Sequence, residues 1–188
     1  IVSFYGLKKD KVPMIYNGID LGKCCPKEAY SLSEPACLLH IGRFNEQKNH
    51  EGLLQAFSYV VKDYPNCCLK LIGDGDLQEK MKAYAEELGI QEKVLFLGSQ
   101  SNVYPFLQKA DIFLLPSRYE GMPMSIIEAM GTGLPVVASA VGGVPDMLED
   151  GVSGMLVACD PEMFWGFASV DPRTPDAEGK LIQAFEEY

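Results

Sequence analysis

Two acidic and two basic residues are of types that could carry chemistry. Glu120 and Glu128 stand eight positions apart, and Arg43 and Lys48 stand five positions apart earlier in the chain. An ionised carboxylate only accepts hydrogen bonds, so it pairs naturally with sugar hydroxyl groups. Arginine offers phosphate a planar fork of donors, and lysine offers a mobile point charge. A ligand with hydroxyl groups at both ends and phosphate in the middle, such as a nucleoside diphosphate sugar, would suit two such carboxylates.

Glu120 is expected on a loop at the end of a strand. The run 110–115, ADIFLL, is apolar and rich in β formers, as buried parallel strands are, and Pro116 ends it. Residues 117–121 then form a polar connection. Open α/β sheets bind ligands in the crevice beyond the carboxyl ends of their strands, so this loop is a candidate binding loop.

Glu128 is expected on the helix that follows. Pro123 suits a first helical turn, residues 125–130 have helical propensity, and Gly131 with Gly133 supplies the stop. Unpaired amides at such a helix start favour anionic groups. The carboxylates and the helix start are therefore compatible if they face different parts of one ligand.

Arg43 and Lys48 are expected to bracket a turn between a strand and a helix. The buried strand 36–41, ACLLHI, delivers Arg43 to the carboxyl edge of the sheet, and a polar turn covers 44–49. An amphipathic helix follows, since its apolar residues fall at helical spacing. Within this region His40 is expected to be a hydrogen-bonded packing residue, and His50 is expected to be exposed.

The sequence Asp74-Gly75-Asp76 follows another predicted strand, 67–73, and precedes a helix over about 77–88. Gly73 and Gly75 allow the backbone to pass close to a ligand. Asp76 is expected to cap the helix through its carboxylate. This assignment is favoured over a two-aspartate site for a divalent ion, so no metal is expected.

Six or more strands alternate with helices, which predicts an α/β fold. It should be Rossmann-like, with a mostly parallel sheet, helices on both faces and right-handed crossovers. The further strands are expected at 12–16, 94–97, 135–138 and 155–158, with helices over about 103–110 and 144–148.

The composition excludes some classes of protein. The chain of 188 residues has 47% hydrophobic residues and a net charge of −10, which argues against a nucleic-acid or anionic-membrane surface. No apolar run approaches the roughly 20 residues that span a bilayer. Six cysteines without C-x-x-C spacing suggest reduced thiols and a cytoplasmic setting. The chain begins without methionine, which suggests a fragment.

The segment EGMPMSIIEAMGTGLPVVAS resembles the E-x7-E region of retaining glycosyltransferases of the GT-B fold, known as group 1 or family 4. GGVPDMLEDGVSG is similar to a second pattern of that family, with Asp146 where glutamate is commoner. The likeness covers about 12–160 and points to the carboxyl-terminal, donor-binding domain. It implies transfer of a sugar from a nucleoside diphosphate to an unknown acceptor, with retention of configuration and without a metal or other cofactor.

The resemblance also implies residue roles. Glu120 would face the donor sugar, Glu128 would hold the ribose, and Arg43 and Lys48 would contact the diphosphate. The implied catalytic residues are Glu120, Arg43 and Lys48, and the implied donor-binding set adds Gly73, Gly75, Gly121, Met122, Pro123 and Glu128.

The expected organisation has three parts. Residues 1–20 would be an entry segment from a missing amino-terminal, acceptor-binding domain, 21–168 the donor-binding domain, and 169–188 a tail with a helix. The fragment would be inactive alone, and the full protein would be cytoplasmic or peripheral at the inner membrane, in polysaccharide biosynthesis.

Two alternatives stay open, a nucleotide-sugar epimerase of the same fold and a non-catalytic nucleotide-binding module. A dinucleotide oxidoreductase is disfavoured, because GRFNEQ follows the strand 36–41 where G-x-G-x-x-G would be required.

Overall fold

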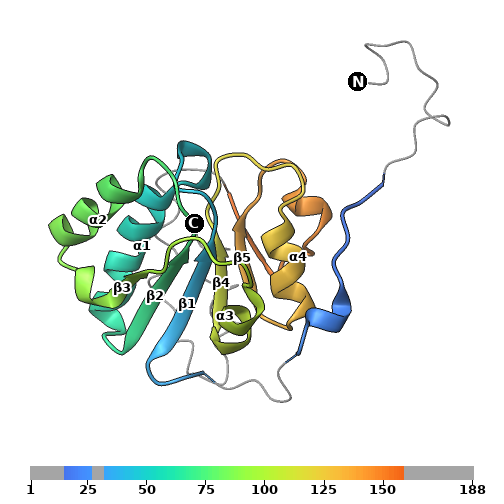
Figure 1. The fold of residues 1–188 in the computed structure, drawn as a ribbon, viewed down its shortest axis with the longest axis horizontal. Helices are drawn as coiled ribbons and strands as arrows, with labels where there is room; N and C mark the ends of the chain where they lie inside the picture. Colours follow the sequence, from blue (N-terminus) through green and yellow to red (C-terminus); the bar gives the residue numbers. More distant parts are fainter. Residues whose placement is uncertain (1–14, 27–31, 159–188) are drawn as a thin grey trace, which may run out of the picture.

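The protein folds around one parallel sheet (Figure 1). The computed structural model describes residues 15–26 and 32–158. Six strands pair in the order β3-β2-β1-β4-β5-β6, and every pair is parallel. The strands are β1 (Ala36–Ile41), β2 (Cys67–Ile72), β3 (Val94–Phe96), β4 (Ile112–Leu115), β5 (Val136–Ser139) and β6 (Met155–Val157). The chain builds outward from β1 to β3 and then crosses to β4, so the strand order reverses between β1 and β4.

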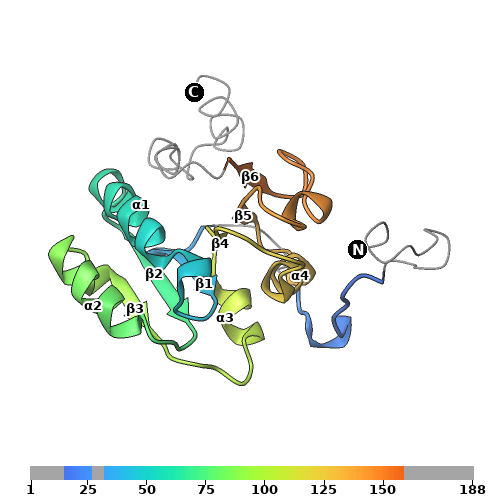
Figure 2. The ribbon, with the colours of Figure 1, turned by 90° about the horizontal axis from the view of Figure 1, so that it is seen from above.

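Helices cover both faces of the sheet, as the sequence predicts. The α-helices are α1 (His50–Asp63), α2 (Gln78–Glu87), α3 (Tyr104–Lys109) and α4 (Met124–Gly131). Short 3-10 helices lie at η2 (Leu21–Lys23), η3 (Glu46–Lys48), η4 (Gln91–Lys93) and η5 (Val144–Asp146). Seen from above, α1 and α3 lie on opposite sides of the sheet (Figure 2).

Two apolar cores follow from this arrangement. On one face, Leu54 and Phe57 of α1 pack with Leu69 and Leu71 of β2. On the other face, Leu107 of α3 and Ile126 of α4 pack with Leu39, Phe113 and Val136. A strand buried on both faces can be apolar at every position, which explains the continuous apolar runs that predicted β1 and β4.

The structure corrects two of the predicted elements. Ile15 and Tyr16 belong to no strand, and Ile15 is 88% exposed, so these residues have no sheet face to bury. Helix α2 starts after Leu77 without a side-chain cap, so Asp76 does not cap it. Instead, the amide of Leu77 donates to the Phe44 carbonyl at 3.1 Å, so a backbone carbonyl of the turn 44–49 accepts the bond at this helix start.

Some predictions lie outside the described residues. They concern residues 1–14, which include the first part of the strand expected at 12–16, and everything from 159 onward, including the helix expected in 169–188. None of the helices within 15–26 and 32–158 has the length and apolar character needed to cross a membrane.

Candidate functional site

The candidate site lies where the strand order reverses. Strands β1 and β4 are hydrogen-bonded neighbours, with Leu38 opposite Ile112 and Leu39 opposite Phe113. Arg43 follows the carboxyl end of β1, and Glu120 follows the carboxyl end of β4. Parallel neighbours end at the same edge of the sheet, so the two loops emerge side by side. A crevice at this point of the sheet is where open α/β folds bind ligands.

Lys48 and Glu120 form an ion pair across these two loops. Lys48 Nζ lies 2.5 Å from Glu120 Oε1, and the two side chains are only 16% and 6% exposed. Asn45 fixes the turn that carries Lys48, because its side chain accepts a hydrogen bond from the Lys48 amide at 3.2 Å. The structure therefore brings together two of the residues that the sequence predicts for the site.

Arg43 stands on the same turn as Lys48 and is exposed. The amide of Gly42, which precedes it, donates to the Ile72 carbonyl at 2.9 Å and extends the pairing between β1 and β2 by one residue. The Arg43 carbonyl accepts from Asn45 at 2.8 Å. The backbone of Arg43 is thus held while its guanidinium stays accessible.

Gln47 is a site residue that the sequence did not point to. Its carbonyl accepts from the Arg118 amide at 2.8 Å, and its side-chain amide donates to the Tyr119 carbonyl at 3.0 Å. The same amide nitrogen lies 3.5 Å from Glu120 Oε2. The only local signal is its place beside Lys48 in the polar turn 44–49, since its partners lie more than 70 residues away.

Gly142 and Gly143 support the Glu120 loop from the other side. A Cβ on Gly142 would stand 1.8 Å from the Glu120 carbonyl oxygen, and one on Gly143 would stand 2.2 Å from that of Gly121. The Gly143 amide donates to the Gly121 carbonyl at 3.1 Å. These glycines therefore pack directly against the Glu120 loop.

Gly73 and Gly75 likewise pack against the turn that carries Arg43. Their φ values are +141° and +145°, where L side chains are rare, and a Cβ on Gly73 would stand 2.0 Å from the Gly42 carbonyl oxygen. The Phe44 amide donates to the Asp74 carbonyl at 2.7 Å. The close passage seen in the structure is to the backbone of residues 42–44, and the predicted approach of these glycines to a ligand stays a prediction.

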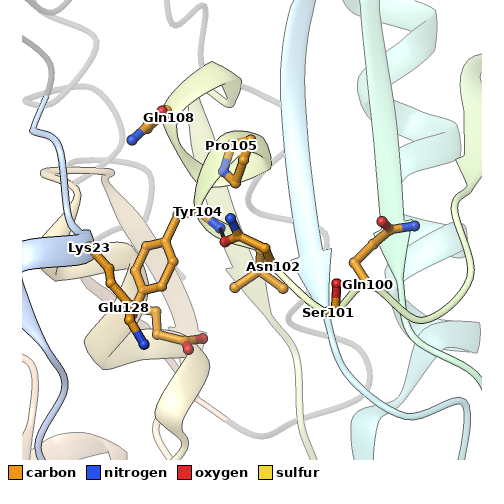
Figure 3. Close-up of a pocket in the computed structure, with 9 residues that line it drawn as sticks. Lys23, Gln100, Ser101, Asn102, Tyr104, Pro105, Gln108 and Glu128 are labelled. Carbon is orange, nitrogen blue, oxygen red and sulfur yellow. Dashed lines mark hydrogen bonds between the residues drawn. The ribbon is translucent and has the colours of Figure 1, made fainter.

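Glu128 of α4 lines a pocket that it shares with η2 and the segment 100–108 (Figure 3). The pocket has a volume of about 730 Å³, and burial raises the pKa of the Glu128 carboxyl above its usual range. Lys23 of η2 and Tyr104 at the start of α3 share its wall. The other lining residues are Gln100, Ser101, Asn102, Val103, Pro105 and Gln108. The lining is rich in amide and hydroxyl groups, and it does not include Arg43, Lys48 or Glu120.

Gly121, Met122 and Pro123 lead from Glu120 into α4. Gly121 is exposed, whereas Pro123 is buried and stands immediately before the first residue of the helix. Met122 anchors the segment that precedes the sheet, because its carbonyl accepts from the Asn17 side chain at 3.2 Å. The segment 15–26 accordingly runs beside α4 in both views of the fold (Figures 1 and 2).

Asp74 is engaged by a neighbouring loop. Its Oδ2 accepts a hydrogen bond from Ser99 Oγ at 2.8 Å. Over the described ranges, histidine, cysteine, aspartate and glutamate form no group of three or more that could hold a metal ion.

A pair of buried histidines lies under the turn. His40 is fully buried and its Nδ1 bonds the Leu114 carbonyl at 2.8 Å, which confirms it as a hydrogen-bonded packing residue. The expected exposure of His50 is wrong, because it is 2% exposed and stacks on Phe44 at 4.0 Å. Asn49, at φ +51°, caps α1 and turns the chain at this point. Burial lowers the pKa of His40 to about 4 and that of His50 to about 2, so both rings are neutral.

Comparison with known proteins shows one family. Residues 27–164 match the family described as Glycosyl transferases group 1. The Vi polysaccharide biosynthesis protein VipC/TviE of Salmonella typhi is 38% identical over 115 residues, which are 61% of this chain and 20% of that protein. The UDP-Gal:alpha-D-GlcNAc-diphosphoundecaprenol alpha-1,3-galactosyltransferase of Escherichia coli is 30% identical over 159 residues, 78% of this chain and 41% of that protein. This chain thus spans less than half the length of either relative.

A solved structure shares the fold. Anabaena Alr3699/HepE in complex with UDP and glucose superposes with a TM-score of 0.77 at 20% identity. The match covers 99% of this chain and 55% of that one. At this identity the likeness supports the fold alone.

Proposed function

The chain belongs to the glycosyl transferases group 1 family, and from that premise we propose that it is the donor-binding half of a retaining glycosyltransferase. The reaction moves a sugar from a nucleoside diphosphate to an acceptor and keeps the configuration at the anomeric carbon. A second, amino-terminal domain binds the acceptor and completes the cleft. The length of the relatives, more than twice that covered by this chain, is consistent with such a domain.

The ion pair between Lys48 and Glu120 is the observation that carries the proposal. It places a cation and a hydroxyl-binding carboxylate within 2.5 Å of each other at the ligand-binding edge of a parallel sheet. A phosphate group pairs with the cation, and a sugar hydroxyl donates to the carboxylate. A sugar joined to a diphosphate presents both groups next to each other, which is the layout that this pair matches.

The remaining residues extend the donor site in two directions. Arg43, on the same turn as Lys48, binds the diphosphate with it, and the glycines Gly73 and Gly75 let that turn pack tightly. Glu128 binds the ribose at the polar pocket. The backbone of Gly121, Met122 and Pro123 faces the sugar beside Glu120.

The chemistry is stabilisation of leaving-group charge. The bond between the anomeric carbon and the diphosphate oxygen breaks, and the diphosphate leaves with the electron pair. The acceptor oxygen bonds to the anomeric carbon on the same face, and its hydroxyl proton passes to the departing diphosphate. Arg43 and Lys48 offset the developing negative charge, which is often the largest single contribution to catalysis. The two cations carry this role without a metal, and no residue of this chain is assigned as a nucleophile.

The names of the relatives support a setting and a donor class for this proposal. The names of two relatives refer to polysaccharide biosynthesis and to a UDP-linked sugar, so UDP-sugars are the first donors to test. The five described cysteines are free thiols, which suits the cytoplasm.

A thermal-shift screen tests the proposal. A ligand that binds only the folded state raises the melting temperature, so at least one of UDP-, GDP- and ADP-glucose should do so, and NAD should not. The Lys48→Met variant should lose the shift. Sugar transfer should appear only when an amino-terminal domain is supplied. A protein that responds to none of the three donors would refute the proposal.

A further inference from the structure

Glu120 is held by more than its ion pair. Lys48 takes one carboxylate oxygen, Oε1, and the second oxygen, Oε2, lies 3.5 Å from the side-chain nitrogen of Gln47. Glu120 is 6% exposed, so water supplies little alternative hydrogen bonding to Oε2. The direction in which this carboxylate presents its oxygens therefore depends on Gln47.

Gln47 itself is fixed by two backbone bonds. Its side-chain amide donates to the Tyr119 carbonyl at 3.0 Å, and its own carbonyl accepts from the Arg118 amide at 2.8 Å. The turn 44–49 and the Glu120 loop are thus joined at three consecutive residues of the loop. Gln47 makes a contact to each of them.

Lys48 and Gln47, the two partners of Glu120, differ in their attraction to a bound diphosphate. Under the proposed function Lys48 serves the diphosphate, so its ammonium is shared between an anionic ligand and Glu120. The Gln47 amide is neutral and carries no such attraction to phosphate. Its hold on Tyr119 and Glu120 can persist while the charge balance around Lys48 changes.

We infer that Gln47 is a positioning residue, which orients Glu120 toward the donor sugar by fixing the loop 118–120. The inference rests on the proposed function, because it assigns Glu120 to the sugar. It predicts that Gln47 contributes to the affinity that the sugar adds, and little to the affinity for the nucleotide alone. Loss of a residue that merely stabilised the fold would not lower the affinity that the sugar adds while it left the affinity for the nucleotide unchanged.

Calorimetry on Gln47→Leu separates these effects. The wild-type chain and the variant are titrated with UDP and with UDP-glucose, and with the GDP and ADP pairs if UDP does not bind. Gln47→Leu should keep nucleotide affinity within about twofold and lower the affinity ratio of nucleotide sugar to nucleotide about tenfold, the scale of a lost hydrogen bond to a charged group. An equal loss for both ligands, or no loss, would overturn the inference.

Two further variants sharpen the result. Gln47→Glu places a second carboxylate beside Glu120, and the two repel each other when both are ionised. The affinity that the sugar adds to that of the nucleotide should therefore fall further in this variant at pH 8 than at pH 5. Gln55→Leu is the matched control, because the Gln55 side chain bonds Tyr59 of α1 and Tyr84 of α2 rather than the Glu120 loop, so its loss should affect stability alone.

Hydrogen exchange gives a readout that does not need a ligand. In Gln47→Leu the Arg118 amide, which donates to the Gln47 carbonyl, should exchange at least about fivefold faster than in the wild type and in Gln55→Leu, because the loop loses its side-chain anchor. Unchanged exchange would overturn the positioning role. If the wild type binds no nucleotide, the proposed function fails, and the exchange rates alone decide the role of Gln47.

Discussion

Lys48 Nζ lies 2.5 Å from Glu120 Oε1, although 72 residues separate them in the chain. The pair joins the first loop of the sheet to the loop after β4, across the point where the strand order reverses. Its two charges are little screened by solvent, because both side chains are largely buried. The pair is therefore a structural link as well as the centre of the proposed site.

A double-mutant cycle measures the strength of this link. Lys48→Met and Glu120→Gln should each lower the free energy of unfolding by about 2 kcal/mol, because each leaves a buried charge without its partner. The double variant should lose less than the sum, with a coupling of about 1–3 kcal/mol in urea denaturation. Lys80→Met is the control, since the Lys80–Glu51 pair is exposed and should contribute less than about 1 kcal/mol. Additive losses would contradict the coupling.

Arg43→Ala should weaken binding without destabilising the fold. The guanidinium is exposed, so its removal costs little stability. The affinity for a nucleoside diphosphate should fall by about 2 kcal/mol or more, roughly thirtyfold, which is the scale for losing one partner of a desolvated charge contact. Calorimetry with UDP and with uridine checks this, because uridine lacks the diphosphate and should bind both proteins equally. Unchanged UDP affinity would remove Arg43 from the site.

The strands were predictable because their signal is local. A strand buried on both faces is a continuous apolar run, and Ala36–Ile41 was predicted with the bounds that the structure shows. The helix after β4 was equally readable from Pro123 and Gly133. The strand order β3-β2-β1-β4-β5-β6 was not, since each pairing depends on segments far apart in sequence.

The residue that the sequence missed, and the two whose surroundings it predicted wrongly, all depend on contacts at long range. Gln47 owes its position to Tyr119 and Glu120, and nothing in the turn around it indicates those partners. His50 looked exposed because polar residues are common at helix starts, yet the Phe44 ring covers it. Asp76 was expected to cap α2 because the preference for aspartate at a helix start considers only the adjacent helix. In the structure the Leu77 amide, at the start of α2, donates to the Phe44 carbonyl.

Gly142→Ala should disturb the Glu120 loop directly. The new Cβ would stand 1.8 Å from the Glu120 carbonyl oxygen, so the loop must move, and the φ of +57° adds backbone strain. The expected loss is about 3 kcal/mol of unfolding free energy, with weaker UDP-sugar binding. Gly89→Ala is the matched control, because its φ is +69° and its Cβ would meet nothing within 4 Å. It should cost only about 1–2 kcal/mol and leave binding intact. Equal effects of the two variants would show that strain alone matters.

Glu128→Gln should raise stability while it lowers affinity. Burial raises the pKa of Glu128, so the ionised carboxylate destabilises the folded state at neutral pH, and stability increases as the group is protonated on acidification. The variant should therefore be more stable than the wild type at pH 7, by a difference that shrinks as the pH falls below the raised pKa. Its affinity for UDP should fall, whereas 2′,3′-dideoxy-UDP, which lacks the ribose hydroxyls, should bind both proteins alike. A variant with wild-type UDP affinity would contradict the ribose role.

The buried histidines should make the fold sensitive to mild acid. The pKa values of about 4 for His40 and about 2 for His50 lie below the ordinary 6.5, so between pH 6.5 and 4 the unfolded chain binds protons that the folded chain does not. The free energy of unfolding must therefore decrease as the pH is lowered, by about 2 kcal/mol for each histidine between pH 6.5 and 5. Besides burial, Lys48 opposes the protonation of both histidines, and His40 also opposes that of His50. His50→Phe keeps an aromatic ring for Phe44 to stack on and removes one titration, so urea denaturation at pH 7 and pH 5 should show about half the wild-type loss. A loss as large as that of the wild type would mean that other groups cause the acid sensitivity.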